Sequence, residues 1–115
     1  MSSMMRDLPA GARLGDLSGP CLLYINVDWC GHCRAAKPIL QKVAGITGSQ
    51  VPVISVNGDN NKALATQLGA QGFPTIVYMD GAGKLFRYTG ERTVDAIASF
   101  VCHNSSSRLD FCEMI

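Results

Sequence analysis

The feature that most constrains the fold is a short apolar run that ends just before two closely spaced cysteines. Residues 21–27 are rich in strand-forming side chains and too few for a helix, so they predict a buried strand. Cys30 and Cys33 follow, and apolar residues then recur at helical spacing from Ala36 to Ile46. The pair therefore lies where a strand gives way to a helix. A thiol at a helix N-terminus meets unpaired N–H groups and the positive end of the helix dipole, which favour its thiolate form.

The patterns along the rest of the chain predict a single α/β domain. The first strand–helix–strand unit should be right-handed, so its strands are parallel, and a later hairpin adds antiparallel pairing. This order predicts a mixed central β-sheet flanked by helices on both faces. The further elements that we expect are a short helix near 13–17, strands at 51–56, 75–79 and 84–88 with a turn at 80–83, a helix from Asn60 or Asn61 to Leu68 stopped by Gly69, and a last helix capped by Thr93.

The composition argues against several function classes. The 115 residues carry a formal net charge of +1, which gives no reason to expect nucleic acid or an anionic membrane as a partner. No apolar run is long enough for a transmembrane segment, residues 1–7 lack the apolar core of a signal peptide, and the last four residues are not an ER-retention signal. The five cysteines are odd in number and are not spaced as a secreted disulfide framework. We therefore expect a reducing, cytoplasmic location, and we expect a monomer.

In a reducing compartment, a Cys-x-x-Cys pair either binds a metal or is redox-active. A zinc site needs four ligands, and the other candidate ligands are Cys21, Cys102, Cys112 and His103. We favour the redox interpretation and expect no metal. Cys30 lies nearest the helix N-terminus, so we assign it as the attacking thiol. Cys33 lies one turn further in and should be the buried, resolving thiol.

Several motifs in order resemble the thioredoxin family over residues 21–102. They are Trp29-Cys30-Gly31-His32-Cys33-Arg34, Pro38 in the following helix, Asp59 after the second predicted strand, Gly72-Phe73-Pro74-Thr75, and Thr89-Gly90. The resemblance implies a thioredoxin fold, with residues 1–20 as an N-terminal lead-in and 103–115 as a polar C-terminal tail. It also implies a protein-disulfide oxidoreductase without a tightly bound cofactor. The Gly31-His32 pair is the variant typical of protein disulfide isomerases.

The resemblance also implies roles for the residues around the dithiol. Trp29, Gly31 and His32 form the active-site loop, and a protonated His32 would favour the Cys30 thiolate. Trp29 should serve partly in packing and partly at the surface beside the site. Phe73, Pro74 and Thr75 match the family's cis-proline loop, which would present backbone to an extended substrate peptide. Electrons would pass from a reductase or glutathione to protein disulfides, in a direction that the residues do not specify.

Two positions depart from the family. The buried acid expected six residues before the first motif cysteine is Tyr24 here, and the lysine that often accompanies it is Ser55. Tyr24 or water would have to accept the proton of Cys33, or exchange would be slow. This departure supports a competing hypothesis, in which the chain is a thioredoxin-fold binding or scaffold module with weak redox turnover.

The remaining cysteines have less specific settings. Cys21 heads a predicted strand and is expected to be buried core filler. For Cys112 we weigh three interpretations: a free thiol on a mobile tail, a regulatory disulfide with Cys102, and prenylation, since it lies fourth from the end. We favour the free thiol, because polar, Ser-rich chain ends are usually disordered.

Overall fold

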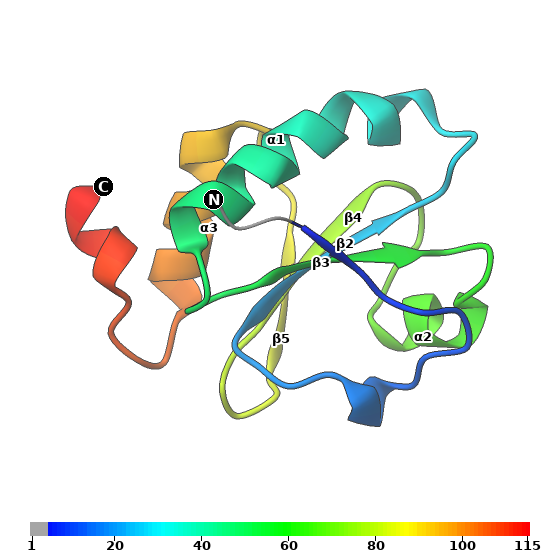
Figure 1. Cartoon of the computed structure of the whole chain (residues 1–115), viewed down its shortest axis with the longest axis horizontal. Helices are drawn as coiled ribbons and strands as arrows, with labels where there is room; N and C mark the ends of the chain where they lie inside the picture. Colours follow the sequence, from blue (N-terminus) through cyan, green and yellow to red (C-terminus); the bar gives the residue numbers. More distant parts are fainter. Residues whose placement is uncertain (1–4) are drawn as a thin grey trace.

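A five-stranded mixed sheet forms the centre of the molecule (Figure 1). The computed structural model describes residues 5–115, so the first four residues of the predicted lead-in lie outside the described residues. The elements are β1 (Arg6–Asp7), η1 (Leu14–Asp16), β2 (Cys21–Asn26), α1 (Gly31–Thr47), β3 (Val53–Asn57), α2 (Lys62–Gln67), β4 (Thr75–Met79), β5 (Leu85–Tyr88), α3 (Val94–Asn104) and η2 (Asp110–Met114). All the helices and strands that the sequence predicts are present, with shifts of one or two residues at their ends.

The strand order in the sheet is β1-β3-β2-β4-β5. β3 pairs in parallel with both β1 and β2, which confirms the predicted parallel strand–helix–strand unit. β4 runs antiparallel to β5, as the predicted hairpin requires, and it also pairs antiparallel with β2. β2 is therefore the central strand, and the cysteine pair follows its carboxyl end.

The two faces of the sheet bury separate apolar clusters. In β2, Leu22 and Tyr24 point toward the cluster that includes α1 and α3, whereas Leu23 and Ile25 point toward the cluster that includes α2. Figure 1 shows the same layering, with α1 on one side of the sheet and α2 on the other. Four of these β2 side chains are at most 1% exposed. Burial on both faces explains why β2 is an unbroken apolar run instead of an alternating one.

The helix ends follow local sequence signals in two cases and tertiary contacts in a third. Thr93 caps α3, and its Oγ1 accepts the N–H of Ala96 at 3.2 Å. Gly69 follows α2 with φ of 85°, the left-handed conformation that stops a helix. Asn61 occupies the N-cap position of α2, but its Oδ1 instead accepts the N–H of Ala12 at 2.9 Å. The lead-in is thus fastened to the domain by a side chain that was expected to cap a helix.

The C-terminal tail is packed and disulfide-bonded, so our preferred interpretation of it was wrong. Cys112 forms a disulfide with Cys102, which corrects the free thiol to the second of our three alternatives. Leu109 and Phe111 are 4% and 5% exposed and join the cluster between α1 and α3. The sequence interpretation weighted the polar, Ser-rich composition, but two apolar side chains and one covalent bond are enough to order a short segment.

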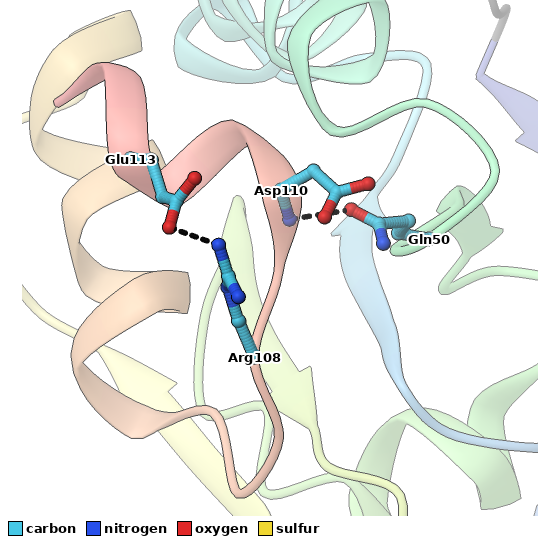
Figure 2. A network of polar contacts seen from close by, with 4 residues as sticks. All are labelled: Gln50, Arg108, Asp110 and Glu113. Carbon is cyan, nitrogen blue, oxygen red and sulfur yellow. Dashed lines mark hydrogen bonds and ion pairs between the residues drawn. The ribbon is translucent and has the colours of Figure 1, made fainter.

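Polar contacts at the tail are shown in Figure 2. The backbone N–H of Asp110 donates to Oε1 of Gln50 at 2.9 Å, which ties the start of η2 to the loop after α1. Arg108 pairs with Glu113 within the tail itself, and both side chains are largely exposed. An exposed pair of this kind contributes little to stability.

Among the described residues, no helix is both long enough and apolar enough to cross a membrane.

Candidate active site

Cys30 is the N-cap residue of α1, so its sulfur lies at the N-terminus of the helix. Its Sγ accepts the backbone N–H of Cys33 at 3.1 Å, and its carbonyl oxygen accepts the N–H of Arg34 at 3.1 Å. The pKa of Cys30 is lowered, first by a hydrogen bond from the Cys33 thiol and then by backbone N–H groups and the charge of Arg34. Each of these stabilises the negative sulfur. Cys30 is therefore the thiol that ionises first.

Cys33 has the opposite electrostatic setting. It is 2% exposed, against 9% for Cys30, and both thiols are free in the structure. Burial raises the pKa of Cys33 to about 11, and its hydrogen bond to Cys30 acts in the same direction. The two cysteines thus divide into a more accessible thiolate and a buried neutral thiol, an arrangement suited to attack followed by resolution.

The loop before β4 lies against Cys30. The Phe73–Pro74 peptide bond is cis, as the sequence predicts, and the carbonyl oxygen of Phe73 lies 3.6 Å from the Cys30 sulfur. Thr75 Oγ1 donates to the Gly72 carbonyl at 2.6 Å and closes the loop. Of the three sequence-predicted residues, Phe73 contacts the dithiol, and Pro74 and Thr75 follow it in the same loop.

Two aromatic side chains border the site. The rings of Trp29 and Phe73 meet edge to face, with centroids 6.2 Å apart. Trp29 is 68% exposed, and its Nε1 donates to Asp59 Oδ2 at 3.0 Å. The Phe73 ring also lies against Gly58, where an added Cβ would stand 2.6 Å from a ring carbon. The end of β3 thus helps to position the cis-proline loop.

Gly31 and His32 occupy the first turn of α1 and are exposed. The tuning role of His32 stays a prediction.

Tyr24 does not provide a base for Cys33. Its hydroxyl is buried and donates to the carbonyl oxygen of Cys33, and burial raises the pKa of Tyr24 well above its ordinary value. Ser55 is paired across the strands with Tyr24, but its Oγ accepts from Asn26 Nδ2 at 2.8 Å. Neither residue supplies a charge beside the buried thiol.

Sequence reasoning missed two features near Cys33. The positive charge of Arg92, in the loop before α3, lowers the pKa of both Cys33 and Tyr24 against the effect of burial. A cavity of about 180 Å³ also lies beside Cys33, with polar lining residues that include Asn26, Asp28 and Lys37. A space of this size with several polar side chains in its lining has room for water. The residues around Arg92 do not indicate its role in the sequence. Arg92 lies 59 residues after Cys33, and the two come near each other only when the chain folds.

The described part of the chain holds no cluster of three or more His, Cys, Asp or Glu side chains that could bind a metal ion. Two of the four candidate zinc ligands, Cys102 and Cys112, are joined to each other. Cys21 is fully buried, as expected, and burial raises its pKa to about 11.

The sequence and the fold of this chain are similar to those of known proteins. A family model described as "Thioredoxin" matches residues 12–103. A mitochondrial thioredoxin domain-containing protein of Schizosaccharomyces pombe is 35% identical over 79% of this chain, and protein disulfide isomerase-like 2-3 of rice is 37% identical over 72%. The chain spans only 27% and 19% of the lengths of these two relatives. A solved structure of a mutant thioredoxin from Halobacterium salinarum superposes with a TM-score of 0.73 at 24% identity, covering 94% of this chain and 98% of that one.

Proposed function

The chain belongs to the thioredoxin family, and we propose that it is a thiol–disulfide oxidoreductase that acts on protein disulfides through Cys30 and Cys33. The observation that carries the proposal is the contrast between the two thiols. Cys30 has a lowered pKa at the helix N-terminus, and Cys33 is buried with a raised pKa. This contrast supports nucleophilic attack by Cys30 on a substrate disulfide, followed by displacement of the substrate by Cys33.

The proposed reaction consists of two successive thiol–disulfide exchanges. The Cys30 thiolate attacks one sulfur of the substrate disulfide and releases the other as a thiolate. Cys33 then loses its proton, attacks Cys30, and releases the second substrate thiolate, so that two electrons pass to the substrate and Cys30–Cys33 becomes the disulfide. The cavity beside Cys33 supports water as the first acceptor of the proton. A reductase or glutathione would restore the dithiol, and no bound cofactor is required.

Reduction of insulin disulfides in the presence of dithiothreitol tests the activity. We expect turnover in the wild-type protein and none above the background rate in Cys30→Ser. Cys21→Ser is the matched control, because it removes a buried free thiol on the other face of the sheet and should retain turnover. Equal rates in the wild type and Cys30→Ser would refute the proposal.

Trapping of partner proteins tests the two assigned roles. Cys33→Ser should accumulate a mixed disulfide through Cys30, because the resolving thiol is absent, and Cys30→Ser should not. Non-reducing gel electrophoresis after thiol blocking measures the trapped species. Equal trapping by both variants would contradict the assignment.

The competing proposal is a binding module with weak redox turnover, and Tyr24 is the observation that favours it. Deprotonation of Cys33 has no buried acid to assist it, since Tyr24 donates to a carbonyl and Ser55 is neutral. This alternative predicts that the wild type and Cys30→Ser bind partner proteins equally and that neither reduces insulin at a useful rate. Phe73, Pro74 and Thr75 would contact an extended peptide under either proposal.

The location and the assembly state remain proposals. The sequence predicts a cytoplasmic monomer, but the Cys102–Cys112 disulfide favours an oxidising compartment. The relative from fission yeast is named as mitochondrial, and several others are named as protein disulfide isomerases. Fractionation of the native host tests the compartment, and sedimentation velocity tests the monomer.

A further inference from the structure

Besides the continuous backbone, the Cys102–Cys112 disulfide is the one covalent cross-link between the tail and the rest of the described residues. Cys102 lies in α3 and Cys112 in η2, and both residues are only partly buried. This differs from Cys21, which is fully enclosed. An external thiol can therefore approach this disulfide without unfolding the sheet.

Few other contacts hold the tail in place. Leu109 and Phe111 insert into the cluster between α1 and α3, and the Asp110 N–H binds Gln50. The Arg108–Glu113 pair joins two tail residues, so it shapes the tail without attaching it (Figure 2). Among the residues that the structure describes, attachment thus depends on two apolar side chains, one hydrogen bond and one disulfide. Without the disulfide, a short segment that so few contacts hold opens at low free-energy cost.

We propose that Cys102–Cys112 is a second redox site, which holds the tail over the apolar cluster when oxidised and releases it when reduced. The external reductant is a dithiol or two molecules of a monothiol such as glutathione. One thiolate of the reductant attacks the sulfur of Cys102 or Cys112, forms a mixed disulfide with it, and releases the other cysteine as a thiolate. A second thiol of the reductant then attacks the mixed disulfide and releases the remaining cysteine. The reductant becomes a disulfide, and Cys102 and Cys112 gain two electrons and two protons as free thiols.

The active-site dithiol of the same molecule is not the reductant. Cys30 lies at the N-terminal end of α1, and the tail lies at the opposite end of a molecule that is 36 Å long (Figure 1). Electrons therefore come from glutathione or from a second molecule. The proposal is independent of whether Cys30 and Cys33 turn over protein disulfides.

Titration with glutathione tests whether the bond is a redox site or a permanent staple. The variant Cys30→Ser/Cys33→Ser leaves Cys102–Cys112 as the one disulfide, and thiol alkylation followed by intact mass measures its state. We expect two additional alkylated cysteines in the folded protein under excess reduced glutathione. If the bond forms but resists glutathione until denaturant is added, or if it is absent under oxidising conditions, the proposal fails.

Amide hydrogen exchange tests the release of the tail. On reduction, exchange at the amides of Cys112 and Ile115 should accelerate by at least about tenfold, whereas β2 should be unchanged. Cys102→Ser/Cys112→Ser should show the fast exchange under both conditions. Reduced wild-type protein gives the same comparison if that variant does not fold. Unchanged exchange at the tail on reduction would show that Leu109 and Phe111 hold it alone, and would overturn the proposal.

Discussion

At the scale of single residues, the chemistry of this protein depends on a difference between two identical side chains. Cys30 ends an extended segment and receives N–H groups from the helix that it caps, whereas Cys33 lies inside that helix and faces the core. Three positions of sequence therefore separate a stabilised thiolate from a thiol whose pKa is raised to about 11. Burial is the main cause of the raised pKa of Cys33, and the hydrogen bond that it shares with Cys30 raises it further while lowering the pKa of Cys30.

The pH dependence of alkylation follows from this difference. In the reduced, folded protein, the rate at Cys30 should rise at lower pH than in the denatured protein, because its folded-state pKa is lowered. Cys33 should react slowly until the pH approaches 11. Peptide-resolved mass spectrometry after brief iodoacetamide treatment measures both rates. Faster labelling of Cys33 than Cys30 at neutral pH would contradict the two directions.

His32 offers a test of tuning within the same turn. His32→Pro should make the Cys30–Cys33 couple more reducing, because it removes a side chain that can carry positive charge beside the thiolate. We expect a change of tens of millivolts, equivalent to about 1–3 kcal/mol for a two-electron couple. Equilibration with glutathione buffers measures the potential. An unchanged or more oxidising potential would exclude His32 as the tuning residue.

At the scale of elements, the site is a junction of three segments. The start of α1 supplies the cysteines, the loop before β4 supplies Phe73 and Pro74, and the turn after β3 supplies Gly58 and Asp59. Gly58 has no room for a side chain, because the Phe73 ring occupies the space that a Cβ would fill. The strand end therefore sets the position of the cis-proline loop.

Gly58→Ala tests this contact. The added methyl group should displace the Phe73 ring and lower kcat/KM for insulin reduction by roughly threefold or more, since a small misplacement at a reacting centre is costly. Gly81→Ala is the matched control, because a Cβ at Gly81 meets nothing within 4 Å. In Phe73→Ala protein the Gly58→Ala change should have little further effect. An equal loss from Gly58→Ala in both backgrounds would show that the contact with Phe73 is not its cause.

At the scale of the whole molecule, two of the three buried free thiols lie on opposite sides of the sheet and have raised pKa values. Cys33 lies on the side of α1, and Cys21 lies in the cluster that includes α2. Burial raises the pKa of each thiol to about 11, so folding favours their neutral forms. The stability that comes from keeping such a group neutral is complete below its unfolded-state pKa and is lost as the pH rises through the folded-state value.

Stability should therefore fall in alkaline solution, and Cys21 provides a clean measurement. Between pH 8 and 11, the free energy of unfolding of the wild type should fall by roughly 2 kcal/mol more than that of Cys21→Ala, given a shift of about two pKa units. Urea unfolding in a phosphine reductant, with both proteins treated alike, gives the two slopes. Parallel pH profiles would show that Cys21 does not titrate as its burial requires.

Much of the fold could be predicted from the sequence, because its signals are local. The apolar run at 21–27, the helical spacing after Cys33, the Thr93 cap and the stop at Gly69 each depend on residues within a few positions of one another. The side-chain patterns of helices and strands repeat every few residues, so they can be recognised in the sequence alone. The motif residues of the site are predictable for the same reason, since Cys30 and Cys33 share one helical turn.

The features that the sequence did not predict depend on partners that are distant along the chain. The Tyr24 hydroxyl donates to the Cys33 carbonyl, and Asn61 binds the lead-in instead of capping its own helix. The positive charge of Arg92 acts on the pKa of Cys33. The tail was misjudged because its polar composition was visible, whereas the apolar cluster that receives Leu109 and Phe111 exists only once α1 and α3 have packed. A side chain's hydrogen bond, charge or burial depends on what surrounds it, and those surroundings form only when the sheet and its helices close around it.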